Sequence, residues 1–396
     1  MTVPDVRPDL PWITAGSIDL AELEAAREQS PIARSDRGYE VLSHAPGVRA
    51  LEHPDLLKGP SFLKRLDDFG ITEGELRRRW NQVVTTTEGE HRTHMRVPLA
   101  RLLRPGQVAK LGDAVRDIVH GALDEIDPSA PVDLVDALAW KIPSRLYCHL
   151  VSAPMELAPT IGRLSDSVLG PLLTQDHSRR QEFVDAFWEG LELVREHIDA
   201  RRKDLGDDFT SAMIQMQLAG ALTEEELLAQ ALSILQASID NTVHQIAIVL
   251  ASLLEDPARW SAVVADPGLV PAATEEAVRL TPRFGTIFRL AARDTELDGV
   301  PIEEGSWVYV SVRSANRDPV VFPDPTRWRL DRPSVRQLMF GAGPYNCLGQ
   351  HMARLEIHEC VRAVVERFPQ ARLAGEWTTR QTNAVTEVTA LPVALG

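Results

Sequence analysis

Cysteines, long apolar runs and positive charge are all scarce in this sequence of 396 residues. The cysteines are only Cys148, Cys347 and Cys360, and they stand far apart without C-x-x-C or Cys/His spacing. Neither a disulfide framework nor a zinc site is therefore predicted. Any cysteine chemistry must depend on a single thiol.

The lack of apolar runs and of basic residues limits the possible partners. The longest apolar stretch covers residues 246–254, whereas a membrane-spanning helix needs about 20 apolar residues. Residues 1–16 have neither a basic start nor an apolar core, so no signal peptide is predicted. The net charge of −15 argues against nucleic acid, which binds basic surfaces. We expect a cytoplasmic protein with no membrane or nucleic-acid partner.

Apolar residues recur at helical spacing through most of the chain, which predicts a mainly α-helical fold with a small β region. Short alternating runs with Gly299 and Gly305 at turns indicate strands. The strands are expected at residues 39–42, 297–302 and 307–312, and the clearest helices at residues 107–126, 178–202, 223–254, 271–280 and 348–368.

The helix expected at residues 223–254 is unusually long. Thr223 and Glu226 have the spacing of a capping box at its start. The helix would contain about 32 residues and be roughly 48 Å long. The polar run 238–242 interrupts its apolar pattern, and polar side chains inside a buried helix need partners or a function. This run is the first indication of a site.

Residues 340–349 read Phe-Gly-Ala-Gly-Pro-Tyr-Asn-Cys-Leu-Gly and precede a predicted helix. A thiolate at a helix N-terminus is stabilised by unpaired amides and the positive end of the helix dipole. Gly341 and Gly343 allow tight backbone angles. A phosphate loop is excluded because no G-K-[ST] follows. The alternative is a glycine-rich turn beside an inert buried cysteine.

The segment resembles the haem-binding signature of cytochromes P450, F-G-x-G-x-(H/R)-x-C-x-G. The resemblance implies that Cys347 ligates the iron of a haem b and that Phe340, Gly341 and Gly349 lie against the cofactor. Gly349 would let the following helix approach the flat macrocycle. Tyr345 departs from the family, which has His or Arg there, and a phenol carries no charge at this position.

Residues 276–279 read Glu-Ala-Val-Arg on a predicted helix, where the first and last side chains share a face. Such a pair alone is common on helix surfaces. It is followed by Asn-Arg-Asp-Pro at 316–319 and by Pro-Thr-Arg-Trp at 325–328, in the order found in P450s. The resemblance implies a buried structural network of Glu276, Arg279 and Arg327 behind the haem.

Haem propionates need cations or strong donors when they are buried. Arg289 matches the family's propionate-binding arginine in the segment after this helix. An early helix is expected to supply the second propionate-binding residue; its sequence at 90–96 is Glu-His-Arg-Thr-His-Met-Arg. Arg96 is the choice there, with Arg92 one turn away. His91 is a further candidate for binding the cofactor, but it is five residues from Arg96, unlike the family spacing, so an ordinary surface or hydrogen-bonding role is favoured for it.

The polar run 238–242 is similar to the family's oxygen-activating A-G-x-(D/E)-T-T segment. The register places Asp240 at the proton-relay acid. Asn241 replaces the usual threonine; its amide can orient water but does not relay protons as a hydroxyl does. Thr242 is a neighbouring hydroxyl that could compensate. The alternative is that Asp240 lies on the wet side of a surface helix.

The resemblance covers nearly the whole chain and implies one P450 domain over residues 1–396, a helical prism with a small β region. It implies insertion of one oxygen atom from O2 into a medium-sized apolar substrate in secondary metabolism, with electrons from a ferredoxin and its reductase docking near Arg101, Arg104 and Arg354. Oxidative C–C or C–N coupling, for instance of an aromatic cyclic dipeptide, and a non-catalytic haem binder are the alternatives. The substrate-pocket residues expected from the family are Leu235, Ser238, Phe284, Thr286, Ile287, Phe288 and Asn383, together with the segment 62–80.

Overall fold

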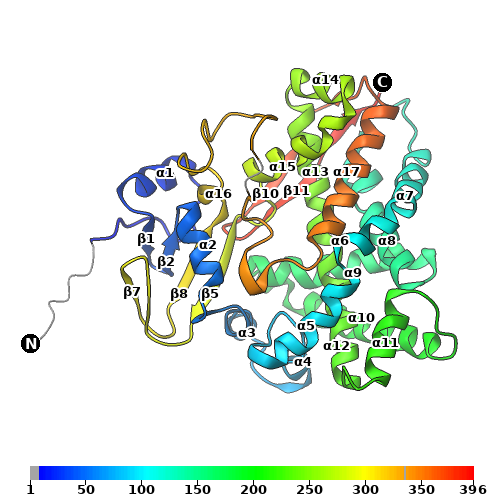
Figure 1. Ribbon diagram of the computed structural model, residues 1–396. Helices are drawn as coiled ribbons and strands as arrows, with labels where there is room; N and C mark the ends of the chain where they lie inside the picture. Colours follow the sequence, from blue (N-terminus) through cyan, green and yellow to red (C-terminus); the bar gives the residue numbers. More distant parts are fainter. Residues whose placement is uncertain (1–8, 334–335) are drawn as a thin grey trace, which may run out of the picture. The chain divides into compact units, whose positions relative to one another are not determined.

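The structure is a computed structural model that describes residues 9–333 and 336–396 (Figure 1). The expectation that there is no signal peptide rests partly on residues 1–8, which lie outside the described residues. The described chain is mainly α-helical with four small sheets, which confirms the predicted fold class. It forms two compact units, the first made of Met1–Phe62, Val278–Cys347 and Gln381–Thr386, and the second of Leu63–Ala277, Leu348–Arg380 and Glu387–Gly396.

The first unit contains a five-stranded sheet with the order β1-β2-β8-β5-β3 (Figure 1). Only β2 and β8 pair in parallel. Gly38 is required between β1 and β2, because its φ is +140° and a Cβ there would lie 2.4 Å from the Trp307 carbonyl oxygen. The unit holds α1 (Leu20–Gln29), β1 (Ile32–Ser35), β2 (Gly38–Val41), α2 (His44–Glu52), β3 (Leu56–Leu57), β5 (Thr286–Ala291), β6 (Thr295–Leu297), β7 (Val300–Ile302), β8 (Trp307–Ser311) and α16 (Val312–Ala315).

The strands agree with the sequence-based prediction except at residues 297–302. This run is not one strand but part of the hairpin β6–β7. The chain turns at Asp298 and Gly299, which have φ of 52° and 81°. The glycine turn predicted inside the run therefore divides it into two strands.

The second unit is helical (Figure 1). Its central helix α13 packs against α9 and α17. The unit holds α4 (Gly74–Trp80), α5 (Gly89–Leu102), α6 (Pro105–Val108), α7 (Gly112–Asp124), α8 (Lys141–Val151), α9 (Ala158–Thr174), α10 (Arg180–Arg201), α11 (Phe209–Leu218), α12 (Glu224–Ser238), α13 (Asp240–Leu254), α14 (Pro257–Ala265), α17 (Gln350–Arg367) and a sheet of β4 (Val132–Asp133), β12 (Pro392–Ala394) and β9 (Arg372–Leu373).

Four elements have residues in both units: α3 (Gly59–Asp68), α15 (Val270–Leu280), β10 (Thr378–Gln381) and β11 (Thr386–Ala390). The segment 62–80, expected to contribute to the substrate pocket, is largely helical, since α3 and α4 occupy most of it. The segment Glu224–Leu254 is long and apolar enough to cross a membrane: an 18-residue window of it has a mean hydropathy of 1.3, but 83% of that window is buried inside the protein. That burial is typical of a core helix.

The predicted long helix has a break at its polar run. Its capping box is present, because the Thr223 side chain accepts from Glu226 N–H and the Glu226 carboxylate accepts from Thr223 N–H. Ile239, with φ −107° and ψ −72°, separates α12 from α13. Ser165 Oγ on α9 donates to the Gln236 carbonyl at 2.8 Å and accepts from Asp240 N–H at 3.3 Å. A side chain inserted between these two main-chain groups is a known cause of a helix kink.

Glu356 is a buried acid on α17, 3% exposed, and burial raises its pKa well above the ordinary value. Its Oε2 has no hydrogen-bond partner among residues 9–333 and 336–396. A carboxyl group with a higher pKa in the folded than in the unfolded state weakens folding as pH rises above the unfolded value of about 4.3. This carboxyl group therefore destabilises the folded state least at acidic pH.

We expect Glu356→Gln to stabilise the protein at pH 8 and to have a much smaller effect at pH 5, because the amide is the neutral counterpart of the protonated acid. Thermal unfolding of both proteins at the two pH values measures this difference. The exposed Glu366 on the same helix supplies the control variant Glu366→Gln, for which we expect no such pH dependence. An equal effect of Glu356→Gln at pH 5 and pH 8 would show that the carboxyl group is ionised at both.

Candidate active site

The loop before α17 presents one cysteine of three at the surface of the protein. Cys347 is exposed, whereas Cys148 and Cys360 are buried. Burial raises the pKa of Cys148 to about 11 and raises that of Cys360 further. Both buried thiols are therefore protonated and inaccessible at neutral pH. Cys347 is the only one of the three whose thiol can reach a ligand.

The backbone of this loop is held in a tight turn. Cys347 N–H donates to the Phe340 carbonyl oxygen at 2.9 Å. Gly341 and Gly343 have φ of 72° and 64°, in the region that favours glycine, as predicted. A Cβ at Gly343 would also lie 3.1 Å from the Cα of Glu52 on α2. Glycine is thus required at 343 by backbone angle and by packing.

Strand β5 faces the cysteine loop with alternate residues. The Arg289 guanidinium lies 4.9 Å from the centre of the Tyr345 ring, and Ile287 Cδ1 lies 3.9 Å from the position of a Cβ on Gly341. Arg289 is 1% exposed and also donates to the Phe288 carbonyl at 2.9 Å. Tyr345 stands where the family has His or Arg. Its ring therefore packs against Arg289, the buried cation predicted to bind a propionate.

The predicted pocket residues Thr286, Ile287 and Phe288 do not share one face. Successive side chains of a strand point to opposite sides, so Phe288 points away from the side on which Ile287 and Arg289 lie. Its ring packs 5.2 Å from Phe62 and is 6% exposed. Of these three predicted pocket residues, only Ile287 lies on the same side of β5 as the cysteine loop.

Three other predicted pocket residues differ in exposure. Leu235 is 0% exposed and is part of the core, so it does not line open space. Phe284 is half-buried and forms a bridge with Val385. Asn383 is exposed, and its carbonyl accepts from Arg313 at 3.1 Å.

Arg279 and Asn316 tie α15 to the start of the cysteine loop. The Arg279 guanidinium donates to the carbonyls of Asn316, at 2.9 Å, and Pro325, at 2.7 Å. The Asn316 amide donates to the Arg279 carbonyl at 3.3 Å, and its Oδ1 accepts from Leu338 N–H at 2.9 Å. Asn316 is 0% exposed. The sequence analysis noted Asn316 within a motif but gave it no role.

The predicted network differs at its third member. Arg327 is exposed, and its contribution is a main-chain carbonyl that accepts from Arg279 at 3.4 Å. The side chain was expected to be buried, but a guanidinium that is left in water avoids desolvation. Glu276, one turn before Arg279, is buried as predicted, 4% exposed.

We expect Asn316→Ala to destabilise the protein by about 1–3 kcal/mol, because Leu338 N–H loses its acceptor inside the core. Haem retention should fall together with the melting temperature, since Leu338 leads into the cysteine loop. Thermal unfolding and the ratio of haem to protein measure both effects. The control is Asn81→Ala at an exposed asparagine, and equal stability of the two variants would contradict the role of Asn316.

Asp240 begins α13 and is completely buried, so it does not lie on a wet helix surface. Its Oδ1 lies 3.2 Å from His244 Nε2. His244 Nδ1 accepts from Val388 N–H at 3.2 Å. Because a main-chain N–H can only donate, Nδ1 is unprotonated and Nε2 carries the ring proton. The protonated Nε2 of His244 therefore lies 3.2 Å from Asp240 Oδ1, although this oxygen has no hydrogen-bond partner among the described residues.

Asp166, on α9, is partly buried, and the charge of Asp240 affects its pKa. Burial first, and then the negative charge of Asp240, raise the pKa of Asp166. Arg179 pairs with Asp166 at 3.1 Å and opposes this rise. His244 was missed in the sequence analysis, although its spacing of four residues from Asp240 puts both on one helix face.

The neighbouring polar side chains cap the carbonyls at the helix break. Asn241 Nδ2 donates to the Ala237 carbonyl at 3.5 Å, and Thr242 Oγ1 donates to the Ser238 carbonyl at 3.3 Å. Among the described residues, Asn241 Oδ1 and Ser238 Oγ have no hydrogen-bond partner. Asn241 and Ser238 are half-buried, whereas Thr242 is 6% exposed. The polar run thus retains hydrogen-bonding capacity beside the buried acid.

The early helix α5 divides its basic residues between core and surface. Arg92 is 6% exposed and Arg96 is half-buried, on the same face one turn later. His91 is exposed, and its Nε2 lies 2.6 Å from the Glu226 carboxylate at the start of α12. His91 was included among the cofactor-binding residues; the structure instead pairs it with Glu226, the hydrogen-bonding role favoured for it.

These residues fit a haem with a thiolate ligand. Within the first unit, Cys347 offers an exposed thiol, and buried Arg289 offers a cation for a propionate. A Cβ on Gly349 would meet no atom within 4 Å, so protein packing alone does not require glycine at this position. Among the described residues, no group of three or more His, Cys, Asp or Glu could hold a metal ion by itself.

Comparisons with known proteins agree with this chemistry. The cytochrome P450 family model matches residues 147–383. Luteothin monooxygenase from Streptomyces thioluteus is 30% identical over 96% of this chain and 94% of its own. The 6-deoxyerythronolide B hydroxylase of Saccharopolyspora erythraea is 32% identical over 78% of this chain and 77% of its own. The P450 enzyme CxnD, for C–S bond formation in chuangxinmycin biosynthesis, has a TM-score of 0.87 at 26% identity over 98% of each chain. The chain belongs to the cytochrome P450 family: it is an oxidoreductase of the monooxygenase class with haem b as its cofactor.

Proposed function

We propose that this protein inserts one oxygen atom from O2 into a medium-sized apolar substrate in bacterial secondary metabolism. The observation that carries the proposal is the completely buried Asp240, with its Oδ1 3.2 Å from His244 Nε2, at the break between α12 and α13. A protein that only carries haem has no use for a buried acid there. The names of the relatives, a luteothin monooxygenase and a 6-deoxyerythronolide B hydroxylase, support the same reaction class.

In this proposal, Cys347 ligates the haem iron, and Arg289, Arg92 and Arg96 neutralise the propionates. When bound, the haem supplies the chemistry of dioxygen cleavage, which a thiolate ligand favours. Tyr345 positions Arg289 through their ring contact at 4.9 Å. Phe340, Gly341 and Gly349 shape the backbone against the cofactor. The substrate pocket includes Ile287 and Ser238.

Asp240 supplies protons to the reduced oxygen. Its Oδ1 lies 3.2 Å from His244 Nε2, and the His244 ring is held by the Val388 N–H that donates to Nδ1. Asn241 Oδ1 can accept a hydrogen bond from a water molecule, and the Thr242 hydroxyl lies one residue further along α13. Together these groups can order water beside the acid, as proton transfer requires.

The electrons come from a separate ferredoxin and its reductase, which we propose act in the cytoplasm. Arg101 and Arg104 are exposed at the end of α5 and the start of α6. Neither makes an ion pair among the described residues, so both can contact an acidic partner. Arg354 is not equally available, because it forms an ion pair of 2.5 Å with Glu275.

Turnover under labelled dioxygen tests the reaction. If the protein is a monooxygenase, one oxygen-18 atom is incorporated per turnover, in the product or in the fragment that it releases. Mass spectrometry of products formed with ferredoxin, reductase and NADPH measures this. Consumption of electrons without labelled product, in the presence of a converted substrate, would reject oxygen insertion.

Oxidative coupling is the second candidate function. It is favoured by Asn241 at the position of the usual alcohol, because an amide does not relay protons as a hydroxyl does. The structural neighbour CxnD, named for C–S bond formation, is compatible with it. A substrate-coupled product without labelled oxygen would establish this reaction. A haem carrier would consume neither oxygen nor electrons when substrate is added.

We expect Asn241→Thr to change the fraction of electrons that appear in product, because a hydroxyl then stands beside Asp240. NADPH consumption, hydrogen peroxide and product, measured in the same reaction, give this fraction. Asn241→Ala is the matched control that removes the amide without adding a hydroxyl. If all three proteins give the same fraction, residue 241 does not influence proton delivery.

A further inference from the structure

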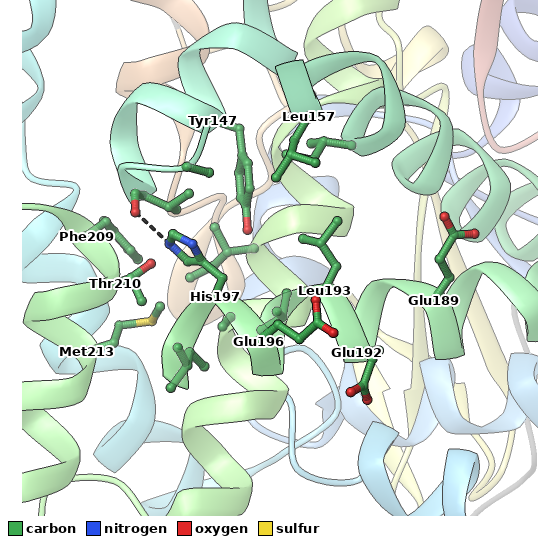
Figure 2. A pocket seen from close by; sticks show the side chains of 17 residues that line it. Tyr147, Leu157, Glu189, Glu192, Leu193, Glu196, His197, Phe209, Thr210 and Met213 are labelled. Atoms are coloured by element: carbon green, nitrogen blue, oxygen red, sulfur yellow. Dashed lines mark hydrogen bonds between the residues drawn. The ribbon is translucent and has the colours of Figure 1, made fainter. Parts of the chain in front are cut away.

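A cavity of about 450 Å³ lies among α8, α9, α10, α11 and α12 (Figure 2). This volume is within the range of about 300–1,000 Å³ that is typical of small-molecule sites. None of the residues proposed to bind haem, oxygen or substrate lines it. The cavity therefore needs an explanation of its own.

Most of the cavity wall is hydrocarbon. Burial of apolar ligand surface against such a wall favours binding by roughly 25 cal/mol per Å². The wall accordingly selects a ligand with an apolar body. Side chains that supply this surface include Val151, Leu157, Ile161, Phe209, Met213 and Ile234.

One hydroxyl group inside the cavity has no partner in the protein. Tyr147 is 6% exposed, and its hydroxyl points into the cavity (Figure 2). No hydrogen bond of this hydroxyl exists within the part of the chain that the structure describes. Burial raises the pKa of Tyr147, so the group stays protonated and can donate. The hydroxyl oxygen is not one of the fully buried side-chain atoms that lack a partner, so it borders the space of the cavity, where a ligand oxygen can accept its hydrogen bond.

Apart from the glutamates at its edge, the wall has two further polar side chains. His197 Nε2 donates to the Val151 carbonyl at 2.7 Å, which fixes the ring at the side of the cavity (Figure 2). Thr210, on α11, is 2% exposed and carries a hydroxyl. The hydroxyls of Tyr147 and Thr210 are thus the groups that can bind the acceptor of a ligand. A ligand with an oxygen atom in its apolar part matches this arrangement.

The edge of the cavity is acidic. Glu189, Glu192 and Glu196 follow each other at one-turn spacing on α10, and all three are exposed. Glu192 pairs with Arg195 at 2.5 Å, and Glu189 pairs with Arg163. Glu196 makes no ion pair among the described residues. An anion would be repelled by this edge, whereas a cation would gain a carboxylate.

We propose that this cavity binds an organic cation with an apolar body that contains a hydrogen-bond acceptor. The body lies against the apolar wall, the acceptor receives the Tyr147 hydroxyl, and the positive charge lies beside Glu196, which makes no ion pair among the described residues. The net charge of −15 adds a long-range attraction for cations. This site is independent of the proposed oxygenase reaction.

The probe is 4-(trimethylammoniomethyl)benzophenone, which has an aromatic body, a carbonyl acceptor and a quaternary nitrogen that cannot coordinate iron. Its uncharged isostere, 4-neopentylbenzophenone, is the matched ligand. Both are titrated into the haem-loaded protein, and light then attaches the benzophenone to nearby C–H groups. Peptide mass spectrometry locates the attachment.

We expect saturable binding of the cation, attachment to α8, α9 or α11 near Leu157 or Met213, and affinity severalfold above that of the isostere, because one exposed carboxylate contributes modestly to binding. The variant Glu196→Gln should remove this preference. Asp185→Asn, at an exposed acid of α10 outside the cavity, should leave it unchanged.

Two further variants test the cavity itself. Ile161→Trp fills it and should abolish attachment. Should that variant fail to fold, Tyr147→Phe removes only the hydroxyl and should weaken both probes severalfold. Attachment confined to residues 284–288 or near residue 383, equal affinity for cation and isostere, or binding unchanged in Tyr147→Phe would each overturn the proposal.

Discussion

Replacing Cys347 by serine will abolish the thiolate absorption of the haem and reduce turnover below detection. A serine hydroxyl stays protonated at neutral pH and donates little charge to iron, whereas a thiolate ligand favours cleavage of the O–O bond. The exposed thiol of Cys347 is the only one of three that a cofactor can reach. The absorption spectrum of the reduced, carbon-monoxide-bound variant, with its NADPH-dependent product formation, measures the loss.

The other two cysteines provide the controls. Cys148→Ala and Cys360→Ala remove buried thiols whose pKa values are raised by burial. Both variants are expected to lose some stability, because a small cavity remains, and to keep the thiolate spectrum. Loss of that spectrum in Cys360→Ala, with its retention in Cys347→Ser, would show that Cys360 is the ligand and Cys347 is not.

Asp240→Asn will slow turnover on the order of 10²-fold, the contribution typical of a positioned acid or base. Haem content should not change, because asparagine has nearly the same size and shape as the aspartate that it replaces. What is lost is the capacity to give and take a proton. Single-turnover rates in H2O and D2O measure the effect, and we expect a larger solvent isotope effect in the variant.

Asp166→Asn is the matched control for Asp240. Asp166 is a second acid, on α9, whose pKa is raised by burial and by Asp240, but it pairs with Arg179. Its replacement should leave both the rate and the isotope effect close to those of the parent protein. If Asp240→Asn behaves in the same way, Asp240 takes no part in proton delivery.

The sequence was sufficient to predict the features that depend on residues close together in the chain. Thr223 and Glu226 form a capping box through contacts three residues apart. Gly341 and Gly343 have the positive φ that their place in the loop indicates. The spacing of Asp240 and His244 would also have indicated a contact, because residues four apart share a helix face.

Features that depend on distant residues were not predictable from the sequence. The polar run marked where the long helix breaks, but the break involves Ser165, which comes from α9. Arg327 was expected to be buried, yet only its carbonyl reaches Arg279. Alternation along the strand puts Ile287 and Phe288 on opposite sides, but which of them faces the cysteine loop depends on the pairing of β5 with β8, and that register is set by tertiary structure.

The reduced, carbon-monoxide-bound absorption spectrum of the purified protein tests the central claim most directly, namely that a haem is held through the thiolate of Cys347. The account predicts a Soret band at the long-wavelength position that is typical of a thiolate ligand. A band at the position of an imidazole ligand, or a preparation that binds no haem, would contradict it.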